Sequence, residues 1–187
     1  MRARDGAEHD HAIEQLVASC RRASRLVDQL LTLARLDPGQ VPAHDVVALD
    51  RLAEEICANH GPQAMAKDIA LELDALPTPL AGNADMLRIL LRNLLDNAIR
   101  YTPPAGKVQV AVAPGILTVT DTGPGIPAPE RQRVFDRFHR LAGQETEGSG
   151  LGLSIVARIA ERHGATVELG AGEAGQGLRV TVRFRTA

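Results

Sequence analysis

The sequence predicts an α+β fold: a two-layer α/β sandwich in which helices cover one face of a mixed sheet, preceded by one long N-terminal helix. Helix-like and strand-like segments come in mixed order, so both hairpins and crossovers are needed to connect them. The chain has 187 residues, of which 44% are hydrophobic. That is enough for one ordinary domain with a short appendage.

The N-terminal segment 7–36 has the pattern of a single helix of about eight turns. Its apolar residues recur every three or four positions from Ile13 to Ala34, which places them on one stripe. The helix ends at Asp37, because Pro38 disfavours the helical conformation in the residue before it. Periodicity alone fits two arrangements, a helix packed on its own domain and one arm of a helical bundle or dimer.

The remaining elements follow a linker at 38–47. Helices are expected at 50–66, 83–101, 130–138 and 151–163, and strands at Asp45–Leu49, Ile69–Leu73, Lys107–Ala113, Ile116–Thr120, Thr166–Leu169 and Leu178–Phe184. Pro114-Gly115 marks a hairpin between two of the strands. Gly164 suits the left-handed position that ends a helix.

Charge and hydropathy exclude two classes of partner. The 21 basic and 23 acidic residues give a net charge of −2, so there is no basic excess to neutralise a nucleic acid. No uncharged apolar run approaches the roughly 20 residues that cross a bilayer. We therefore expect a cytosolic segment that contacts neither nucleic acid nor membrane.

Two asparagines, Asn93 and Asn97, are spaced four residues apart in the strongest predicted helix. This spacing puts both carboxamides on one helix face, with Arg100 and Tyr101 in the next turn. They fit two interpretations: ordinary surface asparagines, or an oxygen ligand for a hard cation such as Mg²⁺.

A glycine-rich loop, Asp121-Thr-Gly-Pro-Gly-Ile-Pro127, comes directly after a predicted strand. Gly123 and Gly125 let a ligand approach the backbone closely, and Asp121 can accept a hydrogen bond from an exocyclic amine. The same composition also suits a simple turn.

A second glycine-rich stretch, Gly148-Ser-Gly-Leu-Gly152, leads directly into a predicted helix. Backbone N–H groups and the helix dipole favour a phosphate at such a position. The stretch is neither a P-loop nor a Rossmann fingerprint, because the Gly-Lys-Ser/Thr ending and a directly preceding strand are missing.

The order of these motifs carries more information than any one of them. The asparagine pair, the D-x-G-x-G loop, Val134-Phe-Asp-Arg-Phe-His-Arg140 and the G-x-G-L-G-L stretch resemble the N, G1, F and G2 boxes of sensor histidine kinases. The resemblance covers about residues 45–186 and implies the ATP-binding fold of the gyrase, heat-shock chaperone, histidine kinase and MutL superfamily. It divides the chain into a partial dimerisation and phosphotransfer helix at 1–37 and a catalytic domain at 38–187.

The resemblance also assigns roles to individual residues. It implies that Asn97 ligates Mg²⁺, that Asp121 reads the adenine amino group, that Arg140 approaches the γ-phosphate and that 139–150 form a lid. Asn93 and Arg140 are the catalytic candidates. The expected ATP-binding set is Asn93, Asn97, Arg100, Tyr101, Asp121, Gly123, Gly125, Ile126, Arg140, Gly148, Gly150, Leu151, Gly152 and Thr166.

The family's phospho-acceptor motif, a histidine followed by an acidic residue and shortly after by a proline, has no good match. His9 precedes Asp10, but no proline follows before Pro38, and one uninterrupted helix leaves no room for the turn of a hairpin. We expect the acceptor on a separate segment, with no self-phosphorylation of this chain. Unpaired, helix 7–36 is expected to self-associate through its apolar stripe.

Asn93 bears on the type of enzyme. The ATPase branch of the superfamily places a glutamate at this position as general base, whereas a carboxamide cannot accept a proton at neutral pH. The resemblance thus implies a kinase with slow hydrolysis, with ATP, Mg²⁺, an acceptor histidine and a response regulator as partners. A non-catalytic nucleotide-binding module and an anti-sigma-type serine kinase are the alternatives.

Overall fold

The computed structural model describes residues 45–141 and 149–185, all within one compact unit, Pro38–Ala187. The predicted helix 7–36 lies outside the described residues. The strands are β1 (Asp45–Ala48), β2 (Ala70–Ala75), β3 (Pro79–Gly82), β4 (Lys107–Ala113), β5 (Ile116–Asp121), β6 (Thr166–Ala171) and β7 (Leu178–Arg183). The helices are α2 (Leu49–Ala66), α3 (Ala84–Tyr101) and α4 (Gly152–Arg162).

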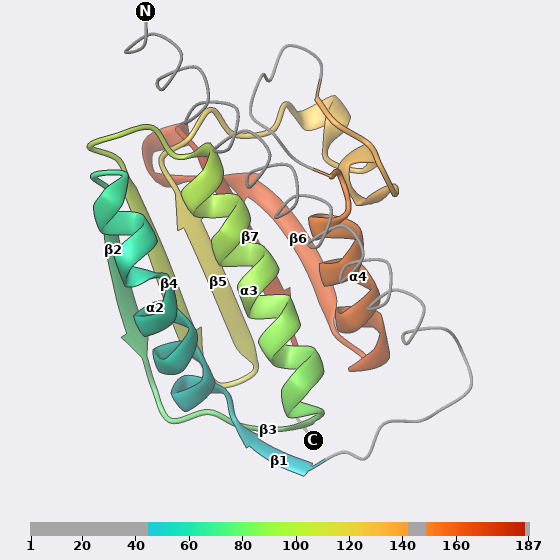
Figure 1. Cartoon of the computed structure of the whole chain (residues 1–187). Helices are drawn as coiled ribbons and strands as arrows, with labels where there is room; N and C mark the ends of the chain where they lie inside the picture. Colours follow the sequence, from blue (N-terminus) through green and yellow to red (C-terminus); the bar gives the residue numbers. More distant parts are fainter. Residues whose placement is uncertain (1–44, 142–148, 186–187) are drawn as a thin grey trace, which may run out of the picture. The chain divides into compact units, whose positions relative to one another are not determined.

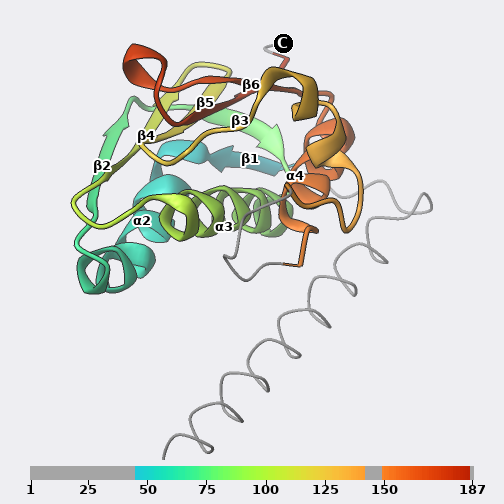
Figure 2. The same cartoon turned by 90° about the horizontal axis from the view of Figure 1, so that it is seen from above.

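Five strands form the main sheet in the order β2-β4-β5-β7-β6, and β1 and β3 pair separately as an antiparallel ribbon. β2 is parallel to β4, whereas the other neighbours in the main sheet are antiparallel. All three helices lie on one face of this sheet, with α3 between α2 and α4 (Figures 1 and 2). The α+β sandwich with a mixed sheet is therefore confirmed.

The core lies between this sheet and the helices. Every second residue of β4 is buried, starting with Val108, and the same alternation continues through Leu117 and Val119 of β5. These side chains face fully buried leucines of α3 such as Leu87 and Leu95. Burial of each such side chain contributes roughly 1.5–3 kcal/mol, so the amphipathic pattern suffices to place α3 on the sheet.

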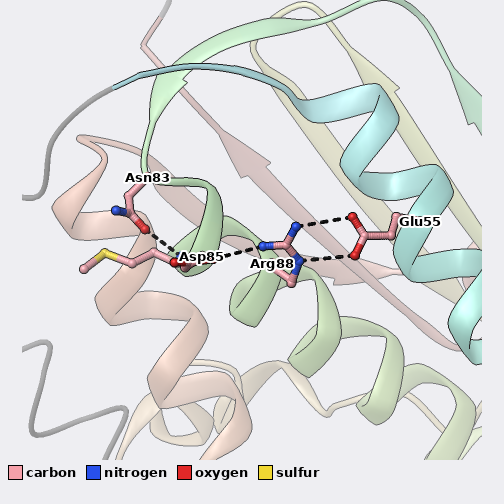
Figure 3. A network of polar contacts seen from close by, with 5 residues as sticks. Glu55, Asn83, Asp85 and Arg88 are labelled. Atoms are coloured by element: carbon pink, nitrogen blue, oxygen red, sulfur yellow. Dashed lines mark hydrogen bonds and ion pairs between the residues drawn. The ribbon is translucent and has the colours of Figure 1, made fainter.

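Polar contacts fix the start of α3 against α2 (Figure 3). The Asn83 side chain caps α3 by accepting a 3.0 Å hydrogen bond from the N–H of Met86. Arg88 donates through Nε and Nη2 to the Glu55 carboxylate, each at 3.3 Å, and through Nη1 to Asp85 at 3.0 Å. These ion pairs are largely exposed, so they orient the helices more than they stabilise the fold.

Two sequence expectations about secondary structure were wrong. The segment 130–138 is not one helix but two 3₁₀ turns, Ala128–Glu130 and Arg133–Phe135. Asp136 is extended, with φ −70° and ψ 144°, and this ends the second turn. The second error is β3, since no strand was expected over 79–82.

Candidate functional site

The asparagine pair lies in the middle of α3, and its two members have different surroundings. Asn93 is buried, with 6% of its surface exposed, and its Nδ2 donates to the carbonyl of Ile89 at 2.8 Å. Asn97 is half-buried, and its side chain makes no hydrogen bond to any described residue. Neither carboxamide oxygen accepts a hydrogen bond from a described residue, and the Asn97 oxygen belongs to the more exposed of the two residues.

The first turn of α4 packs directly against this pair. A β-carbon added to Gly152 would lie 3.0 Å from Asn97 Nδ2 and 3.5 Å from Asn93 Oδ1, so a side chain at 152 would crowd the Asn97 amide and touch that of Asn93. No side chain caps the start of α4, which leaves its first N–H groups for an anion. A phosphate bound there would lie next to Asn97.

Asp121 ends β5 and is buried, with 6% of its surface exposed. Its Oδ1 accepts hydrogen bonds from the N–H of Gly123 at 2.8 Å and of Leu178 at 3.2 Å. Burial raises the pKa of this carboxyl, and the two backbone N–H groups counteract that shift. Its Oδ2 has no hydrogen-bond partner within 45–141 or 149–185. This oxygen can therefore accept a hydrogen bond from a ligand.

The end of α3 and the loop after β5 meet at Gly123. A β-carbon there would lie 2.8 Å from the Tyr101 carbonyl oxygen and 3.0 Å from Asp121 Oδ1. Arg100 and Tyr101 are half-buried at this end of α3. The structure thereby brings three separate motifs to one side of the helix layer: the end of α3, the Asp121 loop and the start of α4.

The remaining predicted site residues, apart from Thr166, lie between Ile126 and Leu151. The Ile126 carbonyl accepts a hydrogen bond from Arg131 Nε at 3.1 Å. The Phe138 N–H donates to the Gly150 carbonyl at 3.0 Å, which joins the two ends of the expected lid. Leu151 is fully buried and Arg140 is exposed. Gly148 lies outside the described residues, and the role of Arg140 stays a prediction.

Thr166 does not belong with this set. It is the first residue of β6 and pairs with Arg183, whereas Ala171 at the other end of β6 pairs with Leu178 beside Asp121. The length of the strand, about 3.4 Å per residue, therefore separates Thr166 from the Asp121 loop. Its inclusion was wrong, because sequence position does not reveal strand direction.

Two features that shape the site were not predicted from the sequence. One is the turn Gly172–Gly177, which is followed by the Leu178 N–H that donates to Asp121; no side-chain pattern reveals this contact. The other is Lys67, whose ammonium donates to the carbonyls of Ile99, Arg100 and Thr102 at 2.6–2.8 Å. No sequence signal pointed to this cap on the end of α3.

A family model described as "Histidine kinase-, DNA gyrase B-, and HSP90-like ATPase" matches residues 82–187. The chain belongs to this family. The match spans α3, the Asp121 loop, α4 and the last two strands, so it contains the whole cluster of site residues.

The relatives of this family member are sensor histidine kinases. The sensor protein QseC of Salmonella typhi is 42% identical over 183 residues, which cover 96% of this chain and 40% of that protein. The chain thus spans about 40% of the length of this relative. A structure of the cytoplasmic segment of QseC has 33% identity and a TM-score of 0.65, and the match covers 89% of this chain and 95% of that one.

A solved structure of full-length ShkA in complex with AMPPNP is also similar. It shares 30% identity with a TM-score of 0.72, and the match covers 87% of this chain and 36% of that one. That relative therefore holds a nucleotide, AMPPNP, as is expected for an ATP-binding domain of the family.

No helix within residues 45–141 and 149–185 is long and apolar enough to cross a membrane. No cluster of three or more His, Cys, Asp or Glu side chains that could hold a metal occurs among them.

Proposed function

We propose that this chain is the ATP-binding catalytic portion of a two-component sensor histidine kinase. It would transfer the γ-phosphate of ATP to a histidine on a separate helix, from which a response regulator would take it. The observation that carries the proposal is the closeness of Gly152 to the two asparagines, because an uncapped helix start beside the Asn97 carboxamide suits a phosphate bound together with a cation.

The residues suit the parts of the nucleotide in turn. Asp121 offers Oδ2 to the adenine amino group, and the half-buried Arg100 and Tyr101 lie between this end of the site and Asn97. The uncapped N–H groups at the start of α4 would hold the phosphates. Phosphoryl transfer depends mainly on positioning and charge stabilisation, which these groups supply.

The site also fits Mg²⁺. The Asn97 carboxamide oxygen is a hard donor that makes no hydrogen bond to a described residue, and Mg²⁺ prefers such oxygens. When bound, the ion would neutralise phosphate charge. Asn93 keeps its own amide bonded to Ile89 and supports the helix face from which Asn97 projects.

The relatives support a cytoplasmic location for this chain. QseC has a cytoplasmic segment of this kind, and we extend that location to this chain. The acceptor histidine, the domain boundary at 37/38 and self-association through helix 7–36 all concern residues outside the described part, and they remain proposals. Stable incorporation of label from ATP on His9 or His11 would contradict a separate acceptor.

A titration with a non-hydrolysable ATP analogue tests the proposal. Wild type should bind more tightly with Mg²⁺ than without, and Asn97→Ala should abolish that gain, a loss of about 10- to 100-fold. Arg92→Ala, on the exposed face of the same helix, is the matched control and should retain the gain. Equal affinities with and without Mg²⁺ in wild type would contradict the proposal.

A further inference from the structure

The turn between β6 and β7 lies beside Asp121, because β7 pairs with β5 and Thr120 faces Arg179. The Leu178 N–H at the end of this turn donates to Asp121 Oδ1 at 3.2 Å, although the two residues are 57 positions apart. The Gly123 N–H donates to the same oxygen at 2.8 Å. The carboxylate is thus held from its own loop on one side and from the turn on the other.

Gly177 is what allows the turn to come so close. It is buried with φ +79°, and a β-carbon there would overlap the Asp121 carbonyl oxygen and lie 3.0 Å from Thr122 Cα. These obstacles are backbone atoms, which cannot move aside as a flexible side chain would. Any other residue at 177 must therefore push the turn away from Asp121.

The same turn contains a natural comparison. Gly175 has almost the same backbone angle, φ +82°, but a β-carbon there would meet nothing within 4 Å. Alanine at either position carries the strain of a left-handed conformation. Only alanine at 177 also separates the turn from the carboxylate.

We propose that Gly177 is a positioning residue for base recognition. It holds the Leu178 N–H against Asp121 Oδ1, so that Oδ2 is the oxygen presented to the adenine amino group. This inference rests on the proposed nucleotide-binding function and names the part of the site that distinguishes adenine from guanine. When the turn is displaced, Asp121 loses one of its two N–H donors and the carboxylate is free to rotate.

The test compares ADP and GDP binding, both with Mg²⁺, in wild type, Gly177→Ala and Gly175→Ala. Gly177→Ala should lower ADP affinity at least about tenfold and reduce the preference for ADP over GDP by a similar factor. Gly175→Ala should stay within about twofold of wild type in both. Equal effects of the two variants, or a loss of ADP affinity with unchanged base preference, would overturn the inference.

A second measurement covers the case in which Gly177→Ala does not fold. Hydrogen exchange of the Leu178 amide should be at least about tenfold slower in wild type than in Asp121→Ala, while the Val180 amide in the middle of β7 changes little. Equal exchange of Leu178 in both proteins would overturn the inference. Failure of wild type to bind ADP at all would instead contradict the proposed function.

Discussion

Asn93 and Asn97 are identical side chains one helical turn apart, yet their surroundings differ. Asn93 is buried and hydrogen-bonded to Ile89, whereas Asn97 is half-buried and bonds to none of the residues the structure describes. A side chain that forgoes hydrogen bonds in the folded protein contributes little to stability. We interpret Asn97 as reserved for a ligand and Asn93 as part of its support.

This difference predicts opposite effects on stability. Asn93→Ala should lower the free energy of unfolding by about 1 kcal/mol, because it removes a buried hydrogen bond. Asn97→Ala should leave it unchanged or slightly raised, since alanine is the better helix former. Urea denaturation of both variants is the measurement, and a larger loss for Asn97→Ala would contradict the assignment.

His60 and His163 are bonded in contrasting ways. In His60, Nδ1 faces the Ile56 carbonyl at 2.8 Å and Nε2 faces Asp96 Oδ1 at 3.2 Å, so only the doubly protonated ring can donate to both. In His163, Nε2 accepts the Asn83 N–H at 3.1 Å, which requires that this nitrogen carry no proton. The two acceptors around the buried His60 thus favour its cationic form.

The His60 pair predicts a pH-dependent stability. The hydrogen bond to Asp96 raises the pKa of His60 above its ordinary value of 6.5, despite the opposing effect of burial. The stabilisation is therefore fully present below pH 6.5 and is lost as the pH rises through the folded-state pKa. Unfolding free energies of wild type and Asp96→Asn between about pH 5.5 and 8.5 should converge at the alkaline end. A constant difference would contradict this account.

At the scale of elements, α3 is held at both ends by residues of α2 or just after it. Arg88 joins Glu55 near the start of α3, and Lys67, which follows α2, caps its end with three hydrogen bonds. The carbonyls at a helix end have no partners within the helix, and a cation there also suits the helix dipole. Lys67 therefore fixes the end of α3 that carries Arg100 and Tyr101.

The chain's other lysine provides a control for this cap, because Lys67 and Lys107 are its only two. Lys67→Met should lower the free energy of unfolding by about 1–3 kcal/mol, since it leaves three carbonyls without their donor. Lys107→Met removes only an exposed ion pair with Glu72 and should destabilise the fold much less than Lys67→Met does. Equal losses in thermal or urea denaturation would contradict the capping role.

The elements also show what the sequence could and could not predict. Long periodic segments such as α3 were predicted to within a residue, because burial of one stripe determines them. The four-residue strand β3 has no such pattern, and only its pairing with β1 makes it a strand. In 130–138 the apolar residues suggested a helix, but only Val134 is buried there, so packing does not favour one.

At the scale of the whole molecule, the fold brings together motifs that the sequence shows only in order. The N, G1 and G2 motifs converge because α3, the end of β5 and the start of α4 are neighbours. The order of the three motifs along the sequence was enough to predict that they form one site, since each motif has a recognisable local pattern. The backbone contact from Leu178 could not be predicted, because it depends on strand register and on no particular side chain.

The assembled site predicts slow hydrolysis of ATP when no acceptor is present. Asn93 stands where a general base would be needed, and a carboxamide cannot take a proton from water at neutral pH. A steady-state assay should show turnover far below 1 s⁻¹, the lower end of ordinary enzyme rates. Turnover in the range of a dedicated ATPase that disappears in Asn97→Ala would contradict this.

Phosphate transfer to a histidine supplied in trans tests the central claim most directly. The chain would be mixed with γ-labelled ATP, Mg²⁺ and a separate helical hairpin that carries the acceptor motif, a histidine followed by an acidic residue, alongside the Asn97→Ala variant. The account predicts label on the hairpin that is stable in alkali and lost in acid, as for phosphohistidine, and little label with the variant. Acid-stable label on serine, or tight nucleotide binding without any transfer, would contradict it.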